Sequence, residues 1–440
     1  MRRMPFALAA VSFFALFPAQ LPARQQGSAP AQRPAVFRSD TNLIQVDAYP
    51  MKDGRIVTNL EKSDFEILED GKPQSIEGFE LVKVDPYTAD AVRRDPNTVR
   101  ESLEAAADPK NRVFVVYLDT KHVSIAGGHR AKAPLVKALN RVMAPNDLFG
   151  VITPEMRPSD IAFGRQTVTT EDMLTRYWPW GERDSIIHSA EEDALEPCTR
   201  DPKTGEVLYY NDGPSQIRLL DALIDRQRED KVLTHLESTI DYLGAVRETR
   251  KSLVVFTEGW LLFEPEQSLA ASIGHLLTYV TAAPGVALGA NGRMRGATNP
   301  YAGCINEVQR LANLSDRTRF RQLVQQAQRQ NVVFYPVNPS GLQVFDTPIN
   351  RQQYFNPNSS ESILQQEFSR VTERADHLKE AAENTGGIAV IQNNLDNGLD
   401  QIANELSAYY VLSYYSTNTK FDGKYRQIEV KLKTPGVKVT

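Results

Sequence analysis

Two acidic side chains directly follow strongly apolar runs of the sequence. Asp119 comes after VFVVYL (residues 113–118), and Glu258 comes after SLVVFT (residues 252–257). Continuous apolar runs of this length are typical of strands buried on both faces of a parallel sheet. Because an open α/β sheet binds its ligands at the carboxyl ends of its strands, Asp119 and Glu258 are the first candidates for a functional site.

Other patterns that could carry chemistry are weak. Gly127-Gly128 lacks the Lys and Ser/Thr of a phosphate-binding loop, and the sequence contains no GxSxG nucleophile elbow. No two histidines have the spacing of a metal-binding pair on a helix. We expect the histidines at surface or loop positions: 122, 129, 188, 235, 275 and 377.

The elements that would position Asp119 and Glu258 alternate between strand and helix. Apolar runs that predict strands lie at residues 113–118, 148–153, 160–164, 252–257, 331–337 and 388–392. Helical spacing of apolar residues occurs at 130–143, 216–247, 361–384 and 396–407. This alternation predicts the α/β fold class, with a doubly wound, mainly parallel, Rossmann-like sheet over residues 112–407.

Two flanking segments have a different pattern. Residues 36–84 and 408–440 contain short alternating runs separated by turns such as Asp70-Gly71, which is typical of antiparallel strands. Each segment is too small to bury a good core alone. We therefore expect them to pair into one β-sandwich-like domain, with the α/β unit inserted between them. Residues 85–111 lack a strand pattern and are predicted to be a linker, in part helical.

The N-terminus predicts export. Arg2 and Arg3 precede an apolar run that ends in small residues near Ala23, which is the organisation of a signal peptide over residues 1–23. Residues 24–35 are predicted to be a disordered leader. No later apolar run is long enough to span a membrane, so we expect an exported, periplasmic or extracellular protein without a membrane span in the mature chain.

The charge balance limits the classes of partner. With 50 basic and 55 acidic side chains, the sequence lacks the excess of positive charge that a strongly basic nucleic-acid binder carries. We therefore expect no nucleic-acid partner.

The order of these motifs resembles the von Willebrand factor type A (VWA) family, and in particular its exported bacterial members. The resemblance is carried by VFVVYLDT (113–120), SLVVFTEGW (252–260) and TGGIAV (385–390), and by the flanks DFEILEDGKPQSIEGFELV and YYVLSYYS. It covers most of residues 36–440. It implies a VWA-like domain at 112–407 that acts in adhesion or as a scaffold by binding another protein.

The resemblance also implies a metal-ion-dependent adhesion site. In that family a first loop with Asp-x-Ser-x-Ser, a Thr from a second loop and an Asp from a third hold Mg²⁺, a hard cation that prefers oxygen ligands. The corresponding residues here are Asp119, Thr169 (or Thr167) and Glu258.

The first loop departs from the family pattern. Lys121 and Val123 stand where the two serines would be. An ammonium beside Asp119 and Glu258 would take over the electrostatic role of the cation and repel a real one. We therefore predict a degenerate site, with Asp119 and Glu258 as polar residues at strand ends that form salt bridges to Lys121. No cofactor is expected, and Mg²⁺ is the ion considered.

The α/β unit is longer than the bare family domain that the resemblance implies. The excess lies near residues 171–215 and 260–315, and each of these insertions holds one cysteine, Cys198 and Cys304. In an oxidising compartment we expect these two cysteines to form a disulfide between the insertions; two free thiols are the alternative.

A possible binding face follows from the same arrangement. Lys121 and His122 follow one strand, Trp260 follows another, and Trp178 and Trp180 lie in the first insertion. Aromatic residues anchor many protein interfaces, although those of an insertion more often form its own small core.

The sequence thus predicts an exported, non-enzymatic module that binds an unidentified protein partner. One alternative is a metal-assisted hydrolase that uses Asp119. Haloacid-dehalogenase-like phosphatases also begin with an apolar strand that ends in a nucleophilic Asp, but their general acid two residues later is replaced by Lys121 here. A structural component of an envelope assembly is the other alternative.

Overall fold

The computed structural model describes residues 43–52, 55–84, 93–166, 188–212, 215–276, 286–288, 294–296, 300–341, 360–418, 420 and 426–439. All of them belong to one unit, Asn42–Thr440. The predicted signal peptide and leader lie outside the described residues. So do Thr167, Thr169, Trp178 and Trp180.

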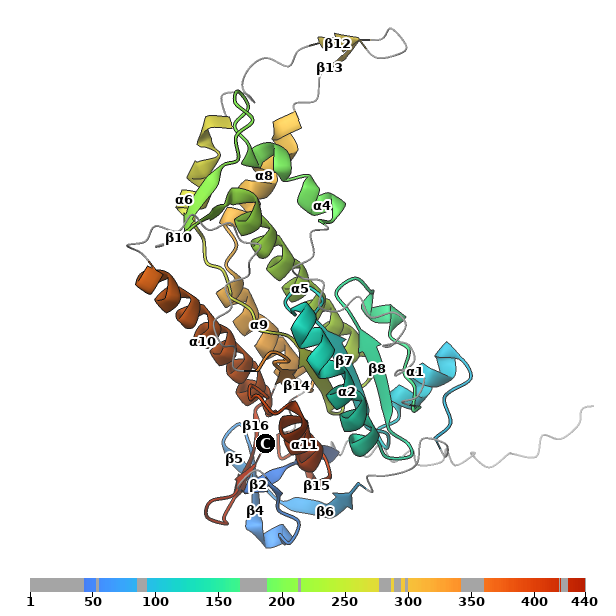
Figure 1. The fold of residues 1–440 in the computed structure, drawn as a ribbon. Helices are drawn as coiled ribbons and strands as arrows, with labels where there is room; N and C mark the ends of the chain where they lie inside the picture. The colour runs from blue at the N-terminus through green and yellow to red at the C-terminus, as the bar shows by residue number, and fades with distance from the viewer. Residues whose placement is uncertain are drawn as a thin grey trace, which may run out of the picture. The chain divides into compact units, whose positions relative to one another are not determined.

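A four-stranded parallel sheet lies at the centre of this unit (Figure 1). Its strands are β7 (Val113–Leu118), β8 (Leu148–Ile152), β11 (Lys251–Phe256) and β14 (Val332–Val337), in the order β14-β11-β7-β8. Every residue of β7, β11 and β14 is buried, which explains their continuous apolar runs. The prediction of a mixed α/β fold with a parallel sheet is confirmed.

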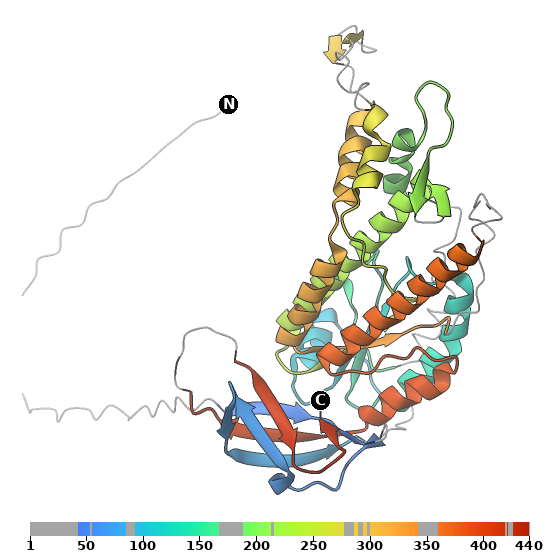
Figure 2. The same cartoon turned by 90° about the vertical axis from the view of Figure 1, so that its left-hand side faces the viewer.

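Helices cover both faces of the sheet (Figures 1 and 2). One face packs against α5 (Leu219–Val246), α9 (Asp316–Arg329) and α10 (Ser360–Thr385), and the other against α2 (Ile125–Val142) and α11 (Leu395–Glu405). Alternate residues of β7 enter the two cores, Val113, Val115 and Tyr117 on one side and Phe114, Val116 and Leu118 on the other.

The predicted strands at 160–164 and 388–392 are reduced to single bridges. Gly164 pairs antiparallel with Phe149, and Val390 pairs parallel with Val337. Counted along the chain, the order across the sheet is therefore third, second, first, fourth, fifth, sixth, which is the doubly wound arrangement. The order reverses between β7 and β11.

The two flanking β segments pair with each other. In one sheet β15 (Ala408–Tyr415) lies between β1 (Leu43–Ala48) and β6 (Ile76–Lys83). Two further sheets pair β16 (Ile428–Leu432) with β4 (Phe65–Glu69), and β17 (Lys438–Val439) with β2 (Pro50–Lys52). The remaining short elements are β3 (Arg55–Ile56), η1 (Lys62–Asp64) and β5 (Lys72–Gln74).

Residues 85–111 are predicted to be a linker that is in part helical, and the described part of this segment contains one helix. Residues Val99–Ala107 form α1, whose Ala106 is buried in the core beneath the sheet. Ser102 Oγ donates a hydrogen bond to the carbonyl of Phe163 at 2.8 Å, and the Arg93 guanidinium donates one to the carbonyl of Met143 at 2.9 Å. This segment therefore packs as part of the α/β unit.

The two insertions form a small core of their own, which we call the insertion core. It contains Leu195, Cys198, Leu269, Cys304 and Val308 together with the first turns of α5. Cys198 and Cys304 form the predicted disulfide there, with their Cα atoms 6.0 Å apart. The elements of the insertions are α4 (Ala190–Asp193), η4 (Glu196–Thr199), β9 (Tyr209–Asp212), β10 (Ser215–Arg218), α6 (Gln267–Ser272), η5 (Gly274–Leu276), β12 (Val286–Leu288), β13 (Met294–Gly296) and α8 (Pro300–Ala312).

Candidate functional site

The candidate site lies at the carboxyl edge of the sheet, where the strand order reverses. Asp119 directly follows β7, and Thr257 and Glu258 directly follow β11. This is the position at which doubly wound folds bind ligands, because the connections from the two strands leave toward opposite faces. Both acidic side chains that the sequence singles out are therefore at this edge.

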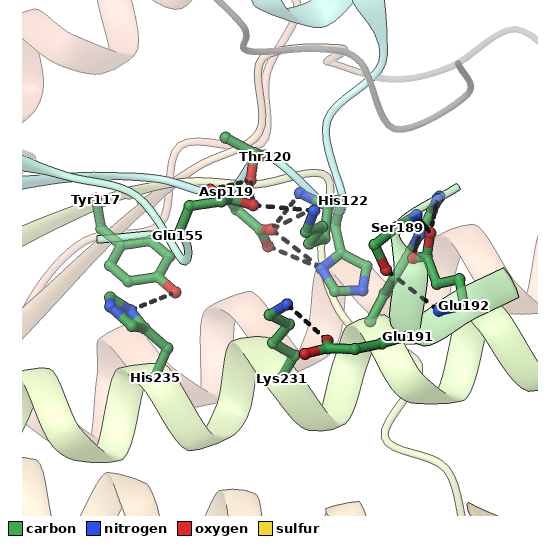
Figure 3. Close-up of polar contacts among 12 residues, drawn as sticks. Tyr117, Asp119, Thr120, His122, Glu155, Ser189, Glu191, Glu192, Lys231 and His235 are labelled. Atoms are coloured by element: carbon green, nitrogen blue, oxygen red, sulfur yellow. Dashed lines mark hydrogen bonds and ion pairs between the residues drawn. The ribbon is translucent and has the colours of Figure 1, made fainter. Parts of the chain in front are cut away.

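Asp119 is fully buried, and five donors surround its carboxylate. Oδ1 accepts hydrogen bonds from the backbone N–H groups of Lys121 (3.0 Å) and His122 (3.1 Å). Oδ2 accepts from Thr257 Oγ1 (2.8 Å) and Trp260 Nε1 (3.2 Å), and His122 Nδ1 lies 2.9 Å away (Figure 3). A carboxylate has about four lone-pair sites, so the two backbone donors and the Thr257 and Trp260 side chains are enough to occupy them.

The surroundings keep Asp119 ionised. Burial alone would raise its pKa, but the His122 imidazole and the hydrogen bonds from Thr257 and the Lys121 backbone lower it below the usual value. The His122 imidazole thus lies directly beside this buried carboxylate.

The predicted salt bridge from Lys121 to Asp119 and Glu258 is wrong. The backbone N–H of Lys121 faces Asp119, while its ammonium lies 2.9 Å from Glu155 Oε1, beyond the end of β8. Thr120 Oγ1 lies 2.8 Å from the same carboxylate, as Figure 3 shows. Burial acts to raise the pKa of Glu155, but these two partners lower it on balance.

Glu258 belongs to a separate cluster. Its Oε1 accepts hydrogen bonds from Ser124 N (2.8 Å) and Ser124 Oγ (2.6 Å), and also from Ser340 Oγ. Ser124 is the N-cap of α2, so the carboxylate lies at the positive end of the helix dipole. A Cβ on Gly127 would lie 2.7 Å from Glu258 Oε1, so a larger residue there would displace the carboxylate from this position. Within the described ranges, no three His, Cys, Asp or Glu side chains are grouped to hold a metal ion.

Two residues of the predicted binding face are buried. Trp260 is 0% exposed, and its ring packs on Phe320 at 5.9 Å between centroids. His122 is 7% exposed, so neither side chain can contact a partner directly. The expectation of surface or loop histidines is also wrong for His377, whose Nδ1 lies 2.9 Å from the Trp260 carbonyl. Lys121 remains partly exposed at this edge.

The sequence analysis missed a buried acid beside this site. Glu229 of α5 accepts backbone hydrogen bonds from Leu261 (2.8 Å), Leu262 (2.5 Å) and Phe263 (3.3 Å). Leu262 has a left-handed backbone, φ 56°, so the loop forms a nest of N–H groups around the carboxylate. Burial still raises the pKa of Glu229, against the effect of His122 and these hydrogen bonds.

A small polar cavity connects Glu229 to the candidate site. Its volume is about 20 Å³, enough for a single water molecule. The lining residues are Lys121, His122, Asp225, Arg228, Glu229, Leu261, Phe263 and Arg374. The sequence does carry a signal for Glu229. Arg226 and Glu229 are charged, yet they occupy positions between Leu223 and Leu233 at which the helical spacing of α5 calls for buried apolar side chains.

The remaining findings concern the chain as a whole. No helix in the described ranges has the length and apolar character needed to cross a bilayer. A comparison with protein-family models and with curated proteins finds no match to this chain.

Proposed function

We propose that this chain is an exported, non-enzymatic protein-binding module, an adhesion or scaffold protein. Its VWA-like domain would bind its partner without a divalent cation. The observation that carries the proposal is the saturated carboxylate of Asp119, which is held by its own backbone, His122, Thr257 and Trp260. In this proposal, these protein groups stabilise the charge of the carboxylate and fix its orientation, as a bound metal ion would.

The same observation argues against the hydrolase alternative. A nucleophilic carboxylate needs a lone pair directed at substrate, and the lone pairs of the buried Asp119 are taken up by donors. The position of the general acid holds Lys121, whose ammonium is paired with Glu155. Binding is therefore the function that the geometry supports best.

The disulfide supports export. Bonded cysteines persist in oxidising compartments and are rare where thiols are kept reduced. The pair Cys198–Cys304 lies inside the insertion core, so the bond is part of the folded unit rather than a surface contact. A periplasmic or extracellular location agrees with this chemistry and with the predicted signal peptide.

The accessible part of the carboxyl edge offers a place for a partner. Ile125, the first residue of α2, is 55% exposed and directly follows Ser124, which binds Glu258. A partner that covers this edge would bury the Ile125 side chain, so this residue reports on the proposed face.

Thermal melts with Mg²⁺ or with EDTA test the metal-free site. We expect the same melting temperature in both, because a cation that does not bind the folded state cannot stabilise it. A rise with Mg²⁺ that is lost on adding EDTA would contradict a metal-free site. Turnover of a phosphomonoester or ester that Asp119→Asn abolishes would contradict the non-enzymatic proposal.

Crosslinked capture from envelope extracts in EDTA tests the binding face. We expect Ile125→Asp to lose the proteins that the unmodified chain captures. Val99→Asp makes the same change at another exposed aliphatic residue, 70% exposed on α1, and should retain them. Equal loss with both variants, or capture that requires Mg²⁺, would argue against the proposed face.

A further inference from the structure

The insertion core is fixed to the sheet through a short set of contacts, which we call the joint. It consists of residues 261–266 and 311–316 with Arg226 and Glu229 of α5. The Arg226 guanidinium donates to the carbonyls of Glu264 (3.2 Å) and Leu311 (3.3 Å). The two chain segments also bond directly, from Glu266 N to the carbonyl of Ala312 at 2.7 Å and from Asp316 N to the carbonyl of Phe263 at 2.8 Å.

Two buried acids lie in the joint, and their carboxyl groups have opposite surroundings. Glu229 accepts three backbone hydrogen bonds from the 261–263 loop. Asp316, the first residue of α9, is 0% exposed, and neither of its carboxyl oxygens has a hydrogen-bond partner among the described residues. A buried carboxylate without donors is far more costly than a neutral carboxyl group. A proton at the joint therefore belongs on Asp316.

On balance, burial and the charged groups around Asp316 also favour the neutral form of its carboxyl group. Glu229 and Asp230 of α5 repel a negative charge there, whereas Arg319 of α9 and Arg226 of α5 attract it. Arg319 is already bound to Asp230 (2.7 Å) and Glu237 (2.7 Å). Burial and the two acids together raise the pKa of Asp316 to about 7. The other charged residues of the joint and of α8 are Glu264, Glu266, Glu307 and Arg310. Arg310 is bound to Asp230 at 2.9 Å and to Glu307 at 2.8 Å.

We propose that the protonation state of Asp316 controls the joint, which stays closed while this buried carboxyl is neutral and loosens when it is ionised. In the closed joint the carboxyl keeps its proton up to about pH 7, whereas in an opened joint it ionises near its ordinary value of about 3.9. The closed state thus binds more protons between these limits, so its stability falls as the pH rises through this window and levels off above pH 7.

Opening of the joint would also affect the candidate site. The loop that bonds to Asp316 through Phe263 also binds Glu229, and Leu261 and Phe263 line the cavity beside His122. Opening of the joint would therefore change this cavity. The inference does not depend on the proposed function, because it concerns the stability of the chain alone.

Hydrogen exchange of the full, disulfide-bonded chain at pH 5 and pH 8, corrected for intrinsic rates, tests the inference. We expect the protection of residues 261–266 and 311–318 to fall by up to about a hundredfold at pH 8, since the window between pH 5 and pH 7 corresponds to about tenfold per pH unit. Asp316→Asn should make protection nearly equal at the two pH values. Asp376→Asn, an exposed acid on α10, should behave like the unmodified chain.

Fluorescence gives a second measurement on the native acid. In a Trp178→Phe/Trp180→Phe chain the remaining tryptophan is Trp260, which packs on Phe320 one turn after Asp316. We expect its emission to titrate with a midpoint near pH 7. The proposal would be overturned if the emission and the protection of this chain did not change with pH. It would also be overturned if the pH dependence persisted in Asp316→Asn. The first outcome is measured with the native acid, so the proposal is testable even if Asp316→Asn failed to fold.

Discussion

Asp119 and His122 are three residues apart, and the short turn after β7 brings the imidazole to 2.9 Å from the carboxylate. A charge that is fully buried needs such a partner, because desolvation of an ion costs several kcal/mol. Two further donors to Asp119, Thr257 Oγ1 and Trp260 Nε1, come from the loop after β11. The carboxylate thus ties the loops after the two central strands together.

Replacing His122 by alanine tests this pair. We expect the free energy of unfolding to fall by about 3 kcal/mol, because the change removes the imidazole from a buried carboxylate and leaves it with neutral donors only. Urea unfolding at pH 7 measures the loss. The matched control is Lys379→Ala, which breaks an exposed pair with Asp376 and should change stability by less than about 1 kcal/mol. Similar losses in both variants would show that the buried pair contributes no more than a surface one.

At the scale of elements, α5 connects two cores. Its first turns place Leu219 and Leu223 in the insertion core, and its later turns place Leu236 and Ile240 beneath the sheet. Arg226 and Glu229, the two residues of α5 that belong to the joint, lie between these two apolar stretches of the helix. The insertion core is therefore attached to the sheet through α5 and the joint, and the disulfide links its two insertions to each other.

Removal of the disulfide by Cys198→Ser with Cys304→Ser should affect the insertion core most. The bond closes a loop with a sequence separation of 106 residues, which corresponds to about 5 kcal/mol in a chain-entropy estimate. We expect faster hydrogen exchange in α8 and the first turns of α5, with the protection of β7, β11 and β14 retained. Equal loss of protection in the sheet would contradict a separate insertion core.

The sequence predicts the elements better than their side-chain contacts. The runs that became β7, β11 and β14 were recognisable because strands buried on both faces must be apolar throughout. The 160–164 run failed as a strand because only Gly164 meets its neighbour. At the site, the partner of Asp119 was predicted as Lys121 and is His122, since the direction of a side chain in a loop depends on the turn that carries it. Asp316 gave no local signal, because its isolation depends on the packing of segments distant in sequence.

At the scale of the molecule, the two β segments are joined through β15, which lies between β1 and β6. A further contact ties these segments to the α/β unit. The Arg250 guanidinium lies 3.9 Å from the ring centroid of Tyr49 and donates a hydrogen bond to the Tyr335 hydroxyl at 2.7 Å. The α/β unit and the flanking sheets therefore share buried contacts.

Truncation of the chain before Ala408 tests how far the flanking sheets depend on one another. The truncated chain lacks β15, β16 and β17, so the described strands β1, β6, β4 and β2 lose their pairing across the two segments. We expect aggregation, because unpaired strand edges associate with other chains. Size-exclusion chromatography of the soluble fraction measures this. Truncation after Leu432, which removes only β17, should leave a folded monomer-sized peak, and a folded chain lacking β15 would contradict the expectation.

The position of β15 also bears on the timing of synthesis. Leu60 N donates a hydrogen bond to the Tyr410 hydroxyl across 350 residues of sequence. Strands β1 and β6 must therefore wait until several hundred further residues have been made before their central partner β15 exists. Pairings this distant form slowly, and the waiting strands are open to misassociation in the meantime. The newly made chain thus has a period of vulnerability in which a holding chaperone would be of most use.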